Sequence, residues 1–211
     1  MKKIEKILLL DVPGLILAVL LGFFVLFFGG IYYLLTLILF LVLSVIATKY
    51  GYNIKKSLGI YEHERSWENV VANGFAPAVA IGLQFFGIFP LGAYIGSIAA
   101  ITSDKFASEL GALAGKPIDL STMKPAKQGK SGCVSVFGLL MSFTGALLIG
   151  LIASLFFGFG PSKIIFIGII GFVGSLIDSL FGVLEEKGIG NKTTTNIICS
   201  LVGLVLGHLL L

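Results

Sequence analysis

Seven long stretches of this chain are almost purely apolar, and they limit its possible folds more than any other feature. They cover roughly residues 12–28, 31–48, 69–88, 91–113, 133–157, 164–184 and 194–211. At about 1.5 Å per residue, each is long enough to cross a hydrocarbon core of about 30 Å as a helix. Hydrophobic residues make up 56% of the 211 residues and charged residues only 12%, which is typical of a polytopic membrane protein. We predict one all-α integral membrane domain over residues 1–211, with about seven transmembrane helices and six as an alternative.

The basic residues predict how this bundle is oriented. With seven helices, all but two of the 15 Lys and Arg residues fall in connections on one side; the exceptions are Lys105, at the same end of the fourth stretch, and Lys163, opposite. Because Lys and Arg are enriched in cytoplasmic loops, the N-terminus is expected inside and the C-terminus outside. The longer, more polar connections share the cytoplasmic side, so we expect an active site facing the cytoplasm from the cell membrane. The net charge of +4 is explained by these loops, without a nucleic-acid partner.

The segment 103–111 introduces charge at the cytoplasmic end of the fourth stretch. It contains Asp104, Lys105 and Glu109, and ionisable groups at membrane depth are costly and usually face a polar cavity or a partner. Helical spacing places Asp104 on one face with small residues, namely Ala100, Ala107, Ser108 and Gly111. This face leaves room for a ligand, although a helix end in interfacial water is the other interpretation. Glu109 lies off this face and is spaced to pair with Lys105.

The sixth stretch repeats this pattern around Asp178. Its small and polar stripe consists of Gly171, Ser175, Asp178, Ser179 and Gly182. No basic residue lies within one helical turn of Asp178 in the sequence, which indicates a functional carboxylate. Mg²⁺ binds one or two carboxylates and leaves its other positions to water and phosphate oxygens. We therefore expect Asp104 and Asp178 to be catalytic and to hold Mg²⁺.

Amides and a basic, glycine-rich loop are expected near the same membrane depth. Asn69 and Asn73 share a helix face close to Arg65; they could form a polar site or simply link helices by hydrogen bonds. The loop before the fifth stretch runs into a helix N-terminus, a place suited to phosphate, although a topogenic loop with a helix cap is the alternative. The residues expected to bind substrate or phosphate are Arg65, Asn69, Asn73, Ser108, Glu109, Lys124, Gly129, Lys130, Ser131, Gly132, Ser135, Ser175 and Asn196.

Four segments spread along the chain carry a family resemblance. They are RSWENVVANG (65–74), SDKFASELG (103–111), GKSGCVS (129–135) and GSLIDSLFG (174–182). In this order they resemble the successive motifs of the phytyl-phosphate kinase family of integral membrane proteins, which also has archaeal, bacterial and animal members. The resemblance implies a kinase that converts a prenyl monophosphate, such as phytyl or geranylgeranyl phosphate, to the diphosphate. The phosphoryl donor would be a nucleoside triphosphate, with CTP as one candidate.

The chain departs from the family pattern in its glycine motif. That motif usually reads Gly-Thr-x-Gly-Gly-Val-Ser, whereas Lys130 and Cys133 here replace Thr and Gly. A Gln is common after Gly182, where this chain has Glu185 and Glu186. The alternatives to the kinase are a cytidylyltransferase acting on a lipid phosphate, and a transporter or flippase that uses the aspartates as cation or proton sites. The chain length of the prenyl group, the donor nucleotide, the oligomeric state and the roles of Glu109 and the altered glycine motif are left open.

Overall fold

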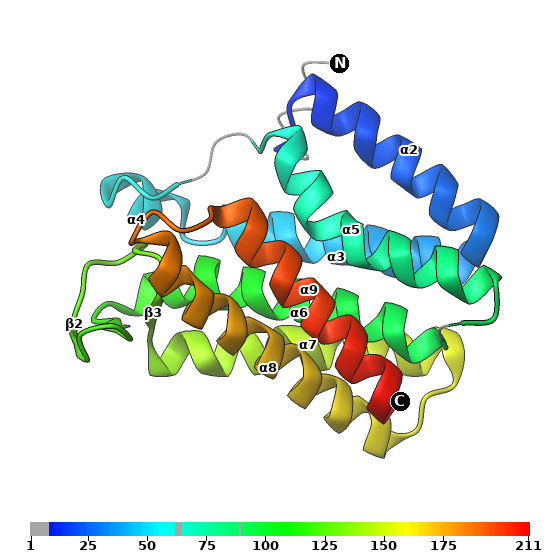
Figure 1. Ribbon diagram of the computed structural model, residues 1–211. Helices are drawn as coiled ribbons and strands as arrows, with labels where there is room; N and C mark the ends of the chain where they lie inside the picture. The colour runs from blue at the N-terminus through cyan, green and yellow to red at the C-terminus, as the bar shows by residue number, and fades with distance from the viewer. Residues whose placement is uncertain (1–8, 62–64, 89) are drawn as a thin grey trace.

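Seven long helices dominate the computed structural model, which describes residues 9–61, 65–88 and 90–211 (Figure 1). They are α2 (Val12–Gly29), α3 (Ile31–Lys49), α5 (Trp67–Phe85), α6 (Leu91–Gly111), α7 (Val136–Phe157), α8 (Pro161–Glu185) and α9 (Lys192–Leu210). Each begins and ends within three residues of a predicted apolar stretch. Five of them, α2, α3, α7, α8 and α9, are long and apolar enough to cross a membrane. The predicted helical membrane bundle is therefore confirmed, while seven spans remain a prediction.

Helix α6 lies at the centre of the bundle. It packs against α3, α5, α7, α8 and α9, and nearly all of its residues are buried. A helix that is buried on every side needs no lipid-facing stripe, which lets α6 carry Asp104, Lys105 and Glu109 in its last turns. The charged segment of the sequence is thus enclosed by protein rather than facing lipid.

Glycines allow α6 and α9 to pack with their backbones in contact. A Cβ atom added at Gly96 would collide with the carbonyl oxygen of Gly203, and one added at Gly207 would collide with that of Gly92. Small residues spaced by four let membrane helices approach this closely and gain van der Waals contacts. This packing brings the start of α9 beside the end of α6.

Helices α2, α3 and α5 form a second layer on one side of α6 (Figure 1). The starts of α2 and α5 are joined by backbone hydrogen bonds between Asp11 N and Arg65 O (3.0 Å) and between Arg65 N and Leu9 O (2.7 Å). Asp11 also caps α2, because its carboxylate accepts a hydrogen bond from Gly14 N at 2.7 Å. Only Gly14 and Val25 of α2 are buried, so this helix exposes most of its apolar surface.

Short elements close the end of the bundle that carries the long connections. They are α4 (Tyr52–Ser57), a 3₁₀ helix (Ala112–Ala114), and three antiparallel strands in the order β2-β1-β3: β1 (Ile118–Asp119), β2 (Lys124–Pro125) and β3 (Cys133–Val134). None of these was predicted. Because Cys133 and Val134 pair with β1, the fifth apolar stretch becomes helical only at Val136.

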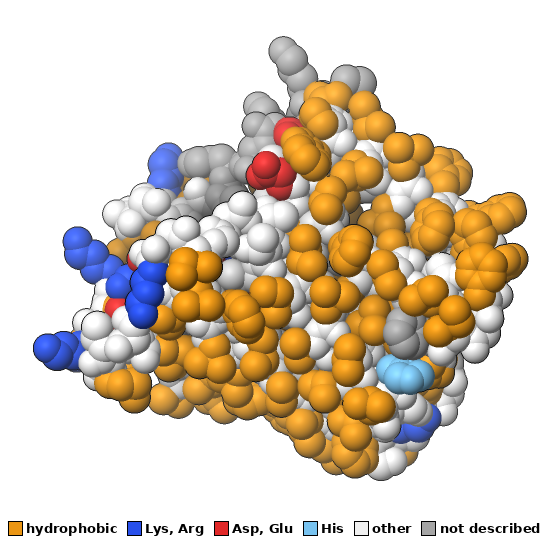
Figure 2. Space-filling model, viewed as in Figure 1, with side chains coloured by type: hydrophobic (Ala, Val, Ile, Leu, Met, Phe, Trp, Pro, Cys, Tyr) orange, Lys and Arg blue, Asp and Glu red, His pale blue; other side chains and the backbone are white. Residues whose placement is uncertain are grey.

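Lys and Arg side chains gather at this same end (Figure 2). Lys163 lies at the opposite end, where its ammonium contacts the carbonyl oxygen of Leu211 at 2.5 Å. The N-terminal lysines that entered the orientation prediction, Lys2, Lys3 and Lys6, lie outside the described residues. Among the described residues, Lys and Arg are thus concentrated at one end of the bundle, as the sequence predicted. This is the end that carries the long polar connections.

Candidate functional site

A polar cavity of about 540 Å³ opens at the basic end of the bundle. Asp104, Ala107, Ser108 and Gly111 of α6 line one side, as the helical period predicts. The opposite wall comes from the stripe of α8, namely Ser175, Asp178, Ser179 and Gly182. The two charged segments, far apart in the sequence, therefore form one site.

The two stripes continue below the cavity as packing surfaces. A Cβ at Gly174 would approach Ala100 within 2.7 Å, and one at Gly171 would press on Ala146 and on the backbone of Ala99. Ala100 and Gly171 therefore hold α6 and α8 together rather than lining the site. The close approach of the two helices is what brings their aspartates to one place.

Asp104 and Asp178 line the same cavity, where their carboxyl groups are close enough to interact electrostatically. Both residues are buried. Lys192, at the start of α9, donates to Asp178 Oδ2 at 3.1 Å. The sequence near Asp178 holds no basic residue, which suggested an unpaired aspartate. The structure shows that Asp178 has a basic partner, which comes from another helix.

Two observations at this carboxylate pair suit a divalent cation. Asp178 Oδ1 is buried and has no hydrogen-bond partner among the described residues, and two carboxylates side by side repel each other unless a cation or a proton compensates them. No group of three or more His, Cys, Asp or Glu side chains at metal-binding spacing occurs in the described part of the chain. Two carboxylates fit Mg²⁺, which fills its remaining positions with water and phosphate oxygens.

The glycine-rich loop covers the cavity and is held tightly against α8. Gly132 has a φ of +69°, and a Cβ there would lie 2.7 Å from the backbone nitrogen of Val183. The backbone N–H of Ser131 donates to Glu186 Oε1 at 3.2 Å. Ser135 caps α7 by accepting from Gly138 N at 3.0 Å, so the N-terminus of α7 faces the cavity. All four predicted loop residues from Gly129 to Gly132, together with Ser135, line it.

Lys130 is fixed at the rim by an acidic partner that the sequence did not reveal. Its ammonium lies 2.7 Å from Asp119 Oδ2, and Ser121 donates both its backbone N–H and its hydroxyl to Asp119 Oδ1. The hydrogen bonds from Lys130 and Ser121 hold the pKa of Asp119 well below its usual range, and the carboxylate of Asp119 raises the pKa of Lys130. Lys130 therefore keeps its charge at the cavity.

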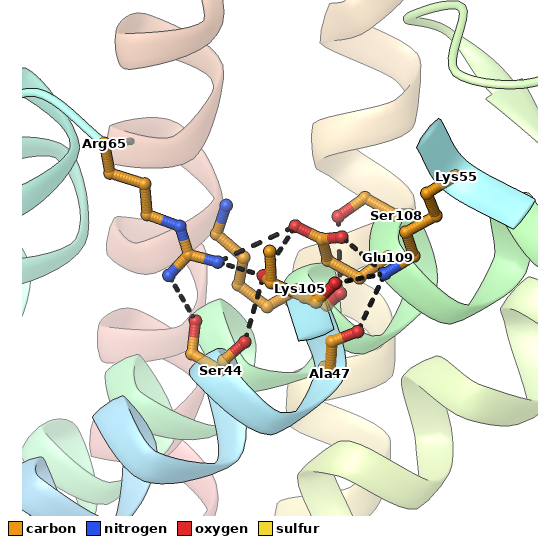
Figure 3. A network of polar contacts seen from close by, with 8 residues as sticks. Ser44, Ala47, Lys55, Arg65, Lys105, Ser108 and Glu109 are labelled. Atoms are coloured by element: carbon orange, nitrogen blue, oxygen red, sulfur yellow. Dashed lines mark hydrogen bonds and ion pairs between the residues drawn. The ribbon is translucent and has the colours of Figure 1, made fainter. Parts of the chain in front are cut away.

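A second ionic cluster lies beside the cavity, around Glu109 (Figure 3). Lys55 of α4 donates to Glu109 Oε2 at 2.8 Å and to the carbonyl oxygens of Ala47 and Thr48. Arg65 lies 3.6 Å from Glu109 Oε1 and donates to Ser44 Oγ at 2.8 Å. Glu109 therefore has ion-pair partners on other elements, in addition to the nearby Lys105 that its spacing suggested.

The remaining predicted site residues are placed away from the cavity or at its edge. Asn69 lines it, whereas Asn73 turns back to donate to the carbonyl oxygen of Asn69 at 2.8 Å. Lys124 is exposed in β2 and does not line the cavity. Asn196 is buried in α9, with its Oδ1 unpartnered among the described atoms. Cavity-lining residues outside the predicted set include Lys55, Lys105, Glu185 and Lys192.

A smaller apolar groove of about 120 Å³ lies between α2, α3 and α5. Its walls are mostly aliphatic and include Ala18, Leu21 and Gly22 of α2 and Leu34, Leu37 and Leu41 of α3. Polar atoms occur where it meets Ser44, Arg65, Asn69 and Asn73. Asn69 lines both the groove and the polar cavity, so the two spaces lie next to each other at this side chain.

Comparisons with known proteins place the chain among integral membrane proteins. A family profile described as "Integral membrane protein DUF92" matches residues 5–203. An uncharacterized membrane protein of Methanocaldococcus jannaschii is 41% identical, with 98% of this chain and 88% of the relative covered. One from Synechocystis is 32% identical, over 74% of this chain and 64% of the relative, and Protein PGR of Arabidopsis thaliana is 29% identical, over 74% and 65%. No solved structure gives a significant match.

Proposed function

The chain belongs to the DUF92 family of integral membrane proteins, and on that premise we propose that it is a prenyl-phosphate kinase. In this proposal it spans the membrane seven times, with the polar cavity facing the cytoplasm. A nucleoside triphosphate enters from the aqueous side, and a prenyl monophosphate enters from the bilayer. The resemblance of the four sequence segments to phytyl-phosphate kinases supplies the substrate class, and the cavity supplies the chemical argument.

The observation that carries the proposal is the buried carboxylate pair in the polar cavity at the basic end of the bundle. Asp104 and Asp178 come from two helices and line the same cavity, and Lys192 forms an ion pair with Asp178. Bound between these aspartates, Mg²⁺ would neutralise charge on the phosphates of the nucleotide. Burying two carboxylates in a membrane protein is energetically unfavourable, and ionisable residues at such positions usually have a functional role.

The groups around the pair suit phosphate oxygens. Lys105, Lys130 and Lys192 all line the cavity, and lysine binds phosphate as a point charge. The N-terminus of α7, capped by Ser135, adds the partial positive charge of its free N–H groups. Lysines and carboxylates therefore line the cavity together, which suits a complex of a cation with phosphates.

The transfer itself needs little beyond positioning and charge neutralisation. An oxygen of the prenyl monophosphate forms a bond to the γ-phosphorus of the nucleotide. The bond from that phosphorus to the oxygen bridging the β- and γ-phosphates breaks, and the nucleoside diphosphate leaves with the electron pair. The products are a prenyl diphosphate and a nucleoside diphosphate, so atoms and charge balance without a covalent enzyme intermediate.

Product analysis with purified protein tests the proposal. The protein is incubated with labelled phytyl or geranylgeranyl phosphate, Mg²⁺ and each nucleoside triphosphate in turn, and the lipids are separated by thin-layer chromatography. The proposal expects a prenyl diphosphate that forms only with Mg²⁺ present. Transfer of the nucleotidyl group, with release of pyrophosphate, would instead identify a cytidylyltransferase.

Asp104→Asn and Asp178→Asn test the carboxylate pair directly. Changes in groups that only orient metal ligands cost about 10- to 100-fold, so the loss of a ligand charge is expected to reduce turnover at least about 100-fold. Glu68→Gln, an exposed carboxylate at the start of α5, is the matched control and should keep normal turnover. If both aspartate variants fold, insert and react at the wild-type rate, the pair is structural and the proposal is wrong.

A further inference from the structure

We propose that the apolar groove between α2, α3 and α5 binds the hydrocarbon chain of the lipid phosphate, with the phosphate directed past Asn69 into the polar cavity. The inference rests on the proposed function, since it names where the lipid substrate of that same site is held. The groove is distinct from the cavity, and the two spaces share Asn69.

The lining of the groove separates apolar from polar along its length. Leu21, Leu34, Leu37, Ile38 and Leu41 contribute hydrocarbon. Polar side chains enter only at the end next to the cavity, where Ser44, Arg65, Asn69 and Asn73 lie. A ligand that fits this distribution has an apolar chain and one polar end group.

The charge beside this polar end favours an anionic group. Two buried cations, Lys55 and Arg65, contact the single carboxylate of Glu109. Arg65 lines the polar end of the groove, and Lys55 lines the cavity that shares Asn69 with it. A phosphate that approaches Asn69 from the groove would come near these two cations, whereas a neutral lipid end group would gain less from them.

The position of α2 allows a lipid to reach the groove from the bilayer. This helix packs mainly on α5 and α3, and it exposes Ile16, Val19, Leu20 and Phe23. Small residues keep the space open: a Cβ at Gly74 would lie 2.5 Å from Leu21, so a larger residue there would displace Leu21. At Gly22 the nearest atom to an added Cβ is Leu34 Cδ1, at 3.5 Å.

Gly22 is therefore the position at which the groove can be filled without disturbing the helix packing. A Gly22→Leu side chain would extend into the groove and compete with the lipid chain. The matched control is Gly82→Leu in α5. A Cβ added there makes only an ordinary 3.7 Å contact with Phe24 of α2, and Gly82 does not line the groove. Both variants introduce the same side chain at a contact that involves α2: Gly22 lies where α2 meets α3, and Gly82 lies where α5 meets α2.

The experiment measures ligand-induced thermal stabilisation of the purified wild type and both variants in detergent. The ligands are geranylgeranyl phosphate, dimethylallyl phosphate and phosphatidylglycerol. We expect Gly22→Leu to weaken the apparent affinity for geranylgeranyl phosphate, relative to dimethylallyl phosphate, by about tenfold or more, equivalent to about two unburied methylene groups. Gly82→Leu should leave this ratio unchanged.

The possible results test the lipid groove separately from the proposed kinase activity. An unchanged ratio in Gly22→Leu, with normal binding of both prenyl phosphates, would overturn the groove and leave the kinase proposal standing. If Gly22→Leu weakened the apparent affinity for phosphatidylglycerol as much as that for geranylgeranyl phosphate, the groove would be a site for bulk lipid. That result would also overturn the inference. The expected shift without formation of a prenyl diphosphate would support the groove and contradict the kinase. Failure of the wild type to bind either prenyl phosphate would overturn the groove as a substrate site.

Discussion

At the scale of single residues, the site depends on charges that meet between separate segments of the chain. Asp178 is held by Lys192, Glu109 by Lys55 and Arg65, and Lys130 by Asp119. Each pair joins positions at least 11 residues apart in the chain. Two of the lysines, Lys130 and Lys192, thereby stand at the cavity with their charges oriented toward its interior or rim.

These positions predict how three lysines differ. Lys130→Met and Lys192→Met should each raise KM for the nucleotide or for the prenyl phosphate. A charge-assisted contact is worth roughly 1.5–3 kcal/mol, or about 10- to 150-fold. Lys124→Met should have little effect, because Lys124 lies on β2 outside the cavity. Steady-state kinetics for both substrates distinguish the cases. Equally small effects at all three positions would show that none of these lysines binds phosphate.

Glu109 and Lys55 should respond unequally to neutralisation. Glu109→Gln leaves Lys55 and Arg65 buried without their shared carboxylate, whereas Lys55→Met still leaves Arg65 near Glu109. Breaking a buried ion pair by removing one partner costs about 3–5 kcal/mol, and we expect Glu109→Gln to fall in this range and to exceed Lys55→Met. Thermal unfolding in detergent measures both. A larger loss in Lys55→Met would contradict this account of the cluster.

At the scale of elements, the packing of α6 on α9 sets the geometry of the site. Gly92 and Gly96 face Gly203 and Gly207 across a backbone-to-backbone contact. The contact places the start of α9, and with it Lys192, next to Asp178. Any change that separates these two helices is therefore expected to affect stability and site geometry together.

Gly203→Val tests this packing. The added side chain would collide with the backbone of Gly96 and with Ala100, and backbone cannot move aside as a side chain can. Overpacking typically costs about 1–3 kcal/mol, and we expect at least that loss of stability in thermal unfolding. Gly160→Ser is the control: nothing lies within 4 Å of a Cβ added at this N-cap glycine, and serine is a favourable N-cap residue, so this variant should be no less stable than the wild type. Normal stability in Gly203→Val would mean that the helices are not in close contact.

At the scale of the whole molecule, the distribution of charge predicts topology. Basic side chains gather around α4, the small sheet and the α8–α9 connection (Figure 2), while Lys163 lies near Leu211 at the other end. The positive-inside rule places the first end in the cytoplasm. If all seven helices cross the membrane, as we propose, the two termini lie on opposite sides and the polar cavity faces the cytoplasm.

Cysteine accessibility in intact cells tests this orientation. Ser57→Cys and Thr122→Cys, both exposed at the basic end, should react with a membrane-impermeant thiol reagent only after the cells are opened. Ser162→Cys, exposed at the start of α8, should react from outside. The unmodified protein serves as the background control, with Cys133 half-buried and Cys199 buried. Labelling of Thr122→Cys from outside would show that the topology is the reverse of the predicted one. The cavity would then face away from the cytoplasm and its nucleotides.

The sequence by itself determined the long helices and the faces that line the site. Apolar length is matched to bilayer thickness, and the helical repeat is a local property, so Asp104 with Ser108 and Asp178 with Ser175 could be assigned to common faces. The capping of α2 by Asp11 also uses neighbours in the chain.

Only the tertiary structure decided which of these faces meet and how their charges are compensated. Lys192 reaches Asp178, Lys55 reaches Glu109 and Asp119 reaches Lys130, and the strands that delay the start of α7 pair with a distant segment. The same holds for the apolar groove, which three helices form jointly. Helical periodicity relates residues a few positions apart, whereas these contacts depend on how closely the glycine surfaces of separate helices allow them to pack.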